Sequence, residues 1–183
     1  AIKQGNVGAV QFLLSKNKSL VNEVDENGRT GLHMAAFQGN EALVNLLLDK
    51  GAVIDARETK ANATPLHMAV QGKSNTVVSL LLKRKAKVNE TMQGNYTVLH
   101  LAASAEDDTL VEILLQNGAL ALLEAKTDKQ CTALHLAAQY GHIKVVELLV
   151  KRKADIEARQ KTNWTPLHFA AQNGREAVIR FLL

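Results

Sequence analysis

The apolar residues of this chain occur in short paired blocks that recur along its whole length. The first block of a pair is rich in leucine and alanine. The second is a longer apolar run, which in one copy reads Val145, Val146, Leu148, Leu149 and Val150. Apolar side chains three and four residues apart lie on one face of a helix, so each pair predicts two short amphipathic helices. The pattern therefore predicts an all-α protein made of helix–turn–helix units.

A six-residue motif, Thr-x-Leu-His-x-Ala, opens these units. It occurs five times, beginning at Thr30, Thr64, Thr97, Thr132 and Thr165, and the threonines are separated by 34, 33, 35 and 33 residues. Self-similarity at a period of roughly 20–50 residues is typical of a repeat protein, in which each unit packs on its neighbours. We therefore expect a solenoid of stacked units joined by polar loops.

The motif contains the signals that begin a helix. Threonine is a preferred N-cap because its hydroxyl accepts a hydrogen bond from a backbone N–H that has no partner inside the helix. In two copies the next residue is a proline, Pro65 or Pro166, which suits the first helical position. Gly141 is expected to end one such helix, since glycine readily adopts the left-handed conformation common after a helix.

These residues resemble the ankyrin repeat, whose signature reads Thr-Pro-Leu-His-x-Ala-Ala, then Gly-His, an apolar Val-Val-x-Leu-Leu-Leu helix and Gly-Ala-Asp. The resemblance covers essentially the whole chain. It implies an ankyrin-repeat solenoid of stacked antiparallel helix pairs whose hairpin loops project along one edge. It also implies that partner proteins are bound in a concave groove.

On this pattern we expect a single repeat domain over residues 1–183. Its expected parts are a partial repeat at 1–23, four repeats at 24–57, 58–90, 91–125 and 126–158, and a truncated repeat at 159–183. Ala1 to Asn6 align with Ala35 to Asn40, and the chain stops inside a second helix. We therefore expect a segment of a longer protein.

Some positions depart from the repeat signature. Lys85 and Lys153 stand where the signature has the glycine before the loop, and Asn62, Asn95 and Asn163 replace the loop glycine that is present at Gly28. Asparagine tolerates a positive φ better than most residues. At a lysine the same conformation is strained, because its Cβ clashes where glycine has none. We therefore predict strain at the two lysines, which a change to glycine should relieve.

Composition indicates a folded, soluble chain. Of 183 residues, 46% are hydrophobic and 22% are charged, as in ordinary globular domains. No apolar stretch approaches the roughly 20 residues that span a bilayer, so we expect no membrane insertion by this segment. The single cysteine, Cys131, allows no intramolecular disulfide and fits a reducing compartment. We expect a cytoplasmic or nuclear protein, although a secreted effector or toxin stays open.

The formal net charge is +4, so a nucleic-acid surface has to be considered. Two basic clusters, Lys83-Arg84-Lys85-Lys87 and Lys151-Arg152-Lys153, resemble short nuclear-localisation patches. Both follow a second helix, where cations complement the helix dipole. We interpret them as solvated helix ends and expect no nucleic-acid binding.

The histidines offer the main candidates for metal or acid–base chemistry. Five of the six occupy one repeat position, three residues after the threonine. There an imidazole can bond back to the threonine hydroxyl and across to the next loop. We therefore expect a structural role for the pairs Thr30 and His33, Thr64 and His67, Thr97 and His100, Thr132 and His135, and Thr165 and His168. Neither a zinc-ligand spacing nor a nucleophile–base pair is present, so we expect no enzyme, no metal and no cofactor.

The seven aromatic residues are the best candidates for binding. Phe12, Phe169 and Phe181 fall at apolar repeat positions, whereas the other four lie just before a motif threonine or at the end of a first helix. In the ankyrin family those positions point into the groove, and Tyr and Trp are enriched at binding hot spots. The predicted anchors are Phe37, Tyr96, Tyr140 and Trp164, with Arg29, Lys129 and Lys161 setting orientation and charge preference. A Tyr or Trp that only shields a neighbouring loop remains the alternative.

The sequence therefore predicts a monomeric, non-enzymatic protein–protein interaction module that binds a partner protein through its concave groove and loop tips. One alternative is a structural spacer or autoinhibitory arm of a larger channel, toxin or effector. A weaker one is recognition of a nucleotide or phosphorylated ligand near Trp164. Replacement of Trp164 by alanine should weaken partner binding and leave stability almost unchanged.

Overall fold

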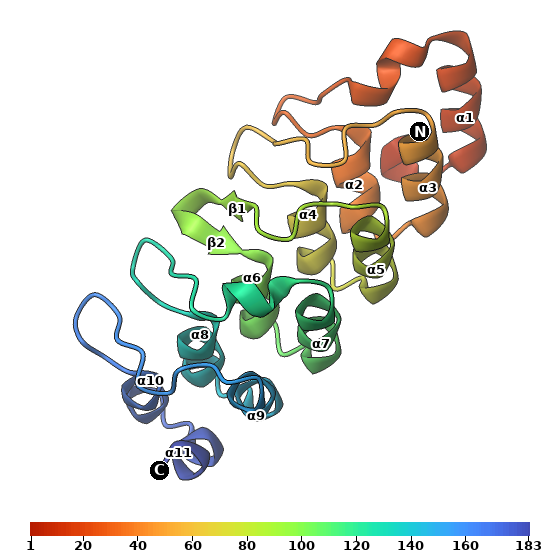
Figure 1. Cartoon of the computed structure of the whole chain (residues 1–183). Helices are drawn as coiled ribbons and strands as arrows, with labels where there is room; N and C mark the ends of the chain where they lie inside the picture. The colour runs from red at the N-terminus through yellow and green to blue at the C-terminus, as the bar shows by residue number, and fades with distance from the viewer. The chain divides into compact units, whose positions relative to one another are not determined.

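The computed structural model describes the backbone of all 183 residues and every side chain except that of Lys3. The chain divides into two compact units, residues 1–93 and 94–183. Both consist of short helices joined by loops (Figure 1), so the all-α repeat fold predicted from the apolar pattern is confirmed.

The first unit has an inner and an outer row of helices. The inner row comprises α2 (Gly31–Phe37) and α4 (Pro65–Gln71), and the outer row comprises α1 (Val7–Lys16), α3 (Glu41–Asp49) and α5 (Asn75–Lys83). The helix α2 packs on α3 and α4, α4 packs on α5, and α3 also contacts α1 and α5. Short 3₁₀ helices, η1 (Ile2–Gln4) and η2 (Lys18–Asn22), flank α1, and β1 (Thr91–Met92) comes near the end of the unit.

The second unit repeats this arrangement. Its inner helices are α6 (Val98–Ser104), α8 (Ala133–Tyr140) and α10 (Pro166–Gln172), and its outer helices are α7 (Asp108–Gln116), α9 (Ile143–Lys151) and α11 (Glu176–Leu182). The strand β2 (Tyr96–Thr97) precedes α6, and η3 (Gln93–Asn95) lies at the division between the units. The apolar stretch that follows α7 contains a further 3₁₀ helix, η4 (Ala119–Leu122).

Buried leucines and alanines form the core between the two rows. The motif leucine is fully buried at Leu32, Leu66 and Leu99, and Leu134 is 1% exposed. The alanines that follow the histidines are also buried, and small side chains there allow inner helices to lie close together. Gly72, the residue after α4, shows how close: a Cβ at this position would come within 2.2 Å of the Phe37 carbonyl oxygen.

The helix boundaries follow the predicted signals. All five motif threonines are N-caps whose histidine completes a capping box, and Gly141 ends α8 with φ of 81°. Lys85 and Lys153 have φ of 71° and 72°. The three loop asparagines also have positive φ, between 56° and 63°. The left-handed positions inferred from the departures are therefore confirmed.

The three phenylalanines at apolar repeat positions are not fully buried, and two of them are exposed. Phe12 on α1 is 61% exposed and Phe181 on α11 is 42% exposed. In the described part of the chain, α1 packs on α3 and η2, and α11 packs on α9 and α10. A helix with neighbours on one side only leaves part of its apolar face uncovered.

Candidate partner-binding surface

The motif histidines form a hydrogen-bonded frame beneath the projecting loops. In every repeat the histidine Nδ1 lies 2.8–2.9 Å from the threonine Oγ1, and it accepts a hydrogen bond from the threonine backbone N–H at 3.1–3.3 Å. An Nδ1 that accepts from an N–H carries no proton, so Nε2 holds the hydrogen. Nε2 then donates to the carbonyl of the next loop, from His33 to Ala63, from His100 to Cys131 and from His135 to Trp164, at 3.0–3.1 Å.

Burial keeps these rings neutral. It lowers the pKa of His33, His100 and His135 below the ordinary value of 6.5, although the carbonyl contacts oppose the shift. A neutral imidazole with both nitrogens engaged is a link between a helix start and a loop. Among the side chains that the structure describes, no group of three or more His, Cys, Asp or Glu residues could hold a metal ion.

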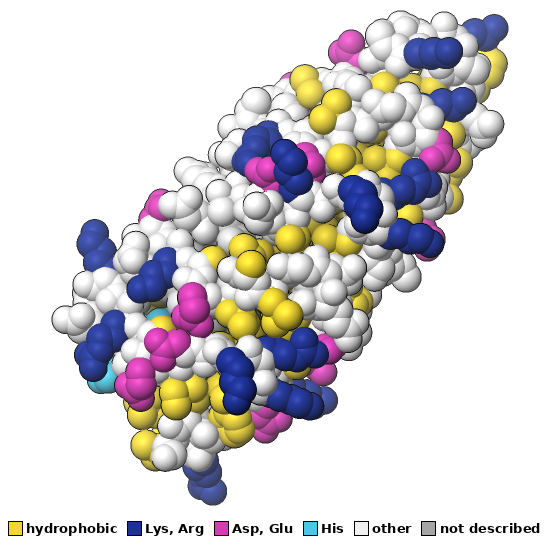
Figure 2. Space-filling model, in the orientation of Figure 1, with side chains coloured by type: hydrophobic (Ala, Val, Ile, Leu, Met, Phe, Trp, Pro, Cys, Tyr) yellow, Lys and Arg dark blue, Asp and Glu magenta, His cyan; other side chains and the backbone are white. Residues whose placement is uncertain are grey.

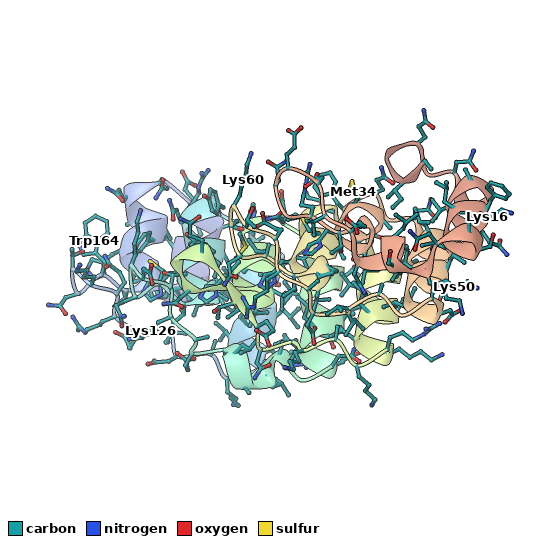
Figure 3. The ribbon with its side chains drawn as sticks, turned by 90° about the horizontal axis from the view of Figure 1, so that it is seen from above. Lys16, Met34, Lys50, Lys60, Lys126 and Trp164 are labelled. Carbon is teal, nitrogen blue, oxygen red and sulfur yellow. The ribbon has the colours of Figure 1, made fainter. Side chains whose placement is uncertain are left out.

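A pocket opens on the inner helices of the first unit, above this frame. It has a volume of about 350 Å³ and is lined by the side chains of Arg29, His33, Met34, Phe37, Gln38, Met68 and Gln71. Phe37 is 54% exposed, and Met34 and Met68 are half-buried. Figure 3 shows Met34 projecting from α2. Two flexible thioethers and an open aromatic ring make a surface that can adapt to an apolar side chain.

Arg29 lies at the rim of this pocket and is held by the loop that carries it. Its guanidinium donates twice to Asp25, at 3.0 and 2.8 Å. The arginine hydrogen bonds are the main reason that the pKa of Asp25 falls from 3.8 to about 2. Arg29 is therefore pre-positioned, and a partner would have to compete with Asp25 for its charge.

The next loop of the same unit is organised around a buried carboxylate. Glu58 is 4% exposed and accepts hydrogen bonds from the backbone N–H groups of Lys60, Ala61 and Ala63 at 2.6–3.1 Å. Burial raises the pKa of Glu58, but these N–H groups outweigh it and hold the pKa below its usual 4.5. The backbone N–H groups at the tip of this loop are thus held by one carboxylate.

In the second unit, Tyr96 and Tyr140 differ in how far they are open. Tyr96 is half-buried and its ring lies edge-on to His100, with centroids 5.8 Å apart. Burial raises the pKa of its hydroxyl. Tyr140, at the end of α8, is 47% exposed and stacks on His142. Tyr140 therefore presents one open ring face, while Tyr96 is partly used in packing.

Trp164 is packed within its own repeat. Its indole stacks on His168 at 6.1 Å and meets Phe169 edge-on at 5.8 Å, and Phe169 in turn lies edge-on to His135. The half-buried ring sits at the start of α10 (Figure 3), and its backbone carbonyl accepts from His135. Through these contacts Trp164 contributes to the stability of its repeat.

Lys129 and Lys161 lie on consecutive loops of the second unit, and both are exposed. The Lys161 N–H donates to the Lys129 carbonyl at 3.3 Å, so the two loops are joined at this point. The predicted residues thus fall into two groups. Phe37 and Arg29 share the pocket of the first unit, and Tyr96, Tyr140, Trp164, Lys129 and Lys161 belong to the second unit.

Sequence reasoning missed the two methionines of the pocket. Met34 and Met68 occupy the variable position inside the motif, between the histidine and the alanine. The same position holds Leu101, Leu136 and Phe169 in the other repeats, and the structure buries Leu136 alone of these five. Variation at a half-buried position within a constant motif was the signal that could have identified them.

Comparison with known proteins agrees with the repeat pattern. A family model described as ankyrin repeats (3 copies) matches residues 54–125 and 99–183, and one described as ankyrin repeats (many copies) matches residues 1–48. The chain therefore belongs to the ankyrin-repeat family. A search of curated proteins returned no match. In the part of the chain that is described, no helix is both long and apolar enough to pass through a membrane.

Proposed function

We propose that this chain is a non-enzymatic interaction module that binds a partner protein through its inner helices and the loop tips beside them. Ankyrin repeats are generally protein-interaction modules, and the family match covers nearly the whole chain. We infer that the module acts as a monomer in a reducing cytoplasmic or nuclear setting, which suits the single buried thiol of Cys131.

The observation that supports this proposal most is the pocket of the first unit. Its volume of about 350 Å³ accommodates one large side chain of a partner, and small pockets with an open aromatic ring are typical of binding hot spots. Phe37 would supply the aromatic contact, the two methionine thioethers would adapt to the incoming side chain, and Gln71 and Arg29 would provide polar contacts at the rim. Tyr140 offers a further contact in the second unit.

Recognition of a nucleotide near Trp164 has less support. Stacking on a base needs an accessible indole face, and His168 already lies against one face of this ring. The spacer or autoinhibitory role has no observation in its favour beyond the repeat fold itself. The protein-interaction proposal is therefore the one that we carry forward.

The proposal is tested by comparing matched variants in capture and in direct binding. The double variant Phe37→Ala, Met68→Ala removes the pocket lining, while Leu120→Ala removes an apolar side chain that is 48% exposed outside the pocket. For a partner captured by the unaltered chain, calorimetry should show a loss of about 2 kcal/mol or more for the double variant and none for the control. Equal binding by all three proteins would show that the pocket is not the contact site.

A further inference from the structure

The net positive charge of the chain comes entirely from the first unit. Residues 1–93 contain 12 Lys or Arg and 8 Asp or Glu, whereas residues 94–183 contain 10 of each. Within the first unit the excess lies in the three stretches that follow the outer helices, 16–22, 49–55 and 83–90. Together these hold seven basic and three acidic residues. The two corresponding stretches of the second unit, 116–123 and 151–158, hold three basic and two acidic residues.

Hydrogen bonds show that these three stretches form one continuous edge. The Asn22 side chain accepts from the Val53 N–H at 2.9 Å and donates to the Gly51 carbonyl at 3.3 Å, which joins η2 to the turn after α3. Asp55 of that turn accepts from the Lys87 N–H at 3.0 Å, which joins it to the turn after α5. Basic side chains gather over the ends of α1, α3 and α5 in Figure 2, and Figure 3 places Lys16 and Lys50 at neighbouring helix ends.

Six exposed lysines make up this surface, which we name the basic edge: Lys16, Lys18, Lys50, Lys83, Lys85 and Lys87. The acidic side chains of the three stretches already have hydrogen-bond or ion-pair partners. Asp49 accepts from Arg84, Asp55 accepts from a backbone N–H, and Glu90 pairs with Arg57. Of the six lysine ammonium groups, only that of Lys87 lies near a carboxylate, at 3.7 Å from Glu90.

Apolar side chains stand among these lysines. Val53 is 53% exposed between Lys50 and the turn after α5, Leu20 is exposed in η2, and Phe12 lies one turn before Lys16, whose ammonium is 5.7 Å from the ring centroid. Leu20 also lines an open apolar hollow of about 490 Å³ beside α1. Cations interspersed with apolar side chains are typical of surfaces that lie on an anionic bilayer, with apolar groups entering the headgroup region.

We propose that the basic edge docks the first unit onto an anionic lipid surface, as a second interaction surface separate from the inner-helix pocket. The lysines supply diffuse attraction, because an ammonium on a flexible stem needs no fixed partner geometry. Arg84, the arginine of the edge, is bonded to Asp49 and Asn45 and has no free fork for bidentate phosphate recognition. This combination favours fluid lipid headgroups over a nucleic-acid backbone.

The test is vesicle flotation of the whole chain with phosphatidylcholine vesicles, with and without phosphatidylserine. The unaltered chain should float with the anionic vesicles alone, and less so as salt is raised. Near an anionic surface each lysine contributes about a fivefold gain in partition. The variant Lys16→Gln, Lys18→Gln, Lys50→Gln, Lys83→Gln should therefore lose several hundredfold in partition, on the order of the product of four such factors.

A matched variant removes the same charge from the second unit: Lys126→Gln, Lys144→Gln, Lys151→Gln, Lys153→Gln. All four of these lysines are exposed, and their loss should leave flotation nearly unchanged. Circular dichroism on both variants confirms that each is folded. Phe12→Ser with Val53→Ser should weaken flotation while leaving its salt dependence in place.

Three results would overturn the proposal. The first is flotation that is equal with neutral and anionic vesicles. The second is an equal loss from both lysine variants. The third is absence of flotation together with tight binding of a duplex oligonucleotide at the same salt concentration, which would assign the basic edge to nucleic acid instead. None of these results depends on whether the inner-helix pocket binds a protein.

Discussion

The loops of the two units are closed by different chemistry at one repeat position. In the loops before α2 and α4 of the first unit, that position holds a carboxylate, Asp25 or Glu58, which accepts hydrogen bonds from two or three backbone N–H groups. In the second unit it holds a neutral side chain. Thr127 accepts from the Cys131 N–H at 3.2 Å, and Gln160 accepts from the Thr162 N–H at 2.8 Å.

This difference shows how a common frame can support surfaces with different properties. The threonine–histidine frame is the same in both units, but at this repeat position the first unit closes its loops with a carboxylate and the second with a neutral side chain. The side chains above the frame differ as well. Phe37 is open in the first unit, while Trp164 is packed against His168 and Phe169 in the second.

The largest expected effect tests whether the buried motif leucine contributes equally to stability in the two units. Leu32→Ala in the first unit and Leu134→Ala in the second each remove a buried side chain, and each should lower the free energy of unfolding by about 2–5 kcal/mol. Urea unfolding followed by circular dichroism measures both. If one of the two losses fell outside this range while the other lay within it, the motif leucine would not contribute equally to the cores of the two units.

Acidification should separate the units. A carboxylate whose folded pKa lies below its unfolded value stabilises the fold above the unfolded pKa, and this contribution is lost as the pH falls through the folded value. For Asp25 the loss runs from 3.8 toward about 2, and for Glu58 it begins below 4.5. Buried histidines, whose pKa is lowered from 6.5, destabilise both units as the pH falls below that value. The difference between the units therefore comes from the carboxylates.

Amide chemical shifts measured by NMR during the titration report on this directly. The N–H groups of Asn27 and Ala61 should follow their carboxylates, while those of Cys131 and Thr162 should not titrate below pH 4.5. Glu58→Gln should abolish the titration at Ala61 and destabilise by about 1–3 kcal/mol, against about 0.5–1.5 kcal/mol for Thr127→Val. Titration of the Cys131 and Thr162 amides alongside the others would remove the distinction.

Replacing one aromatic residue from each unit tests whether a packed ring contributes more to stability than an exposed one. Trp164→Ala should lower stability by about 1–2 kcal/mol, because it removes two ring contacts. Phe37→Ala should change stability by less than about 0.5 kcal/mol, as surface substitutions usually do. This revises the expectation that Trp164 could be replaced without loss of stability. Thermal and urea unfolding of the two variants measures both changes in stability. Equal losses of stability would show that the Trp164 ring is no more tightly packed than the Phe37 ring.

The smallest effect concerns the strained turns after the outer helices. Gly51 and Gly118 occupy this position with positive φ, whereas Lys85 and Lys153 hold the same conformation despite having a Cβ. Lys85→Gly and Lys153→Gly should each stabilise by up to about 1 kcal/mol. A lower urea midpoint for either variant would indicate that the lysine side chain contributes more than its backbone strain removes.

Most of the fold could be predicted from the sequence, because its signals are local. A threonine cap, a proline or a glycine acts within a few residues, and the apolar run of α9 predicts its helix without reference to the rest of the chain. The positive φ at Asn62 and Lys85 could also be predicted, since a repeat reveals what each position requires. The capping of α8 by Thr132 through His135 follows the same logic.

The binding surfaces were harder to predict, because they depend on residues far apart in the chain. Met34 and Met68 meet in one pocket although 34 positions separate them, and neither stands out in its own repeat. Tyr96 and Trp164 are large aromatic residues like Tyr140, and the sequence does not show how exposed each ring is. The contacts of Tyr96 with His100 and of Trp164 with His168 cover part of these two rings. The repeat boundaries and the role of each anchor remain predictions.

The sequence by itself determined the repeat, the all-α fold and the positions of the capping threonines and left-handed residues. Tertiary structure decided which aromatic rings are open, which loop carboxylates are tied to the backbone, and that lysines from three successive repeats share one edge. The physical reason is the range of the interactions. Backbone conformation and capping are set within one turn, whereas exposure and surface charge depend on side chains brought together from different repeats.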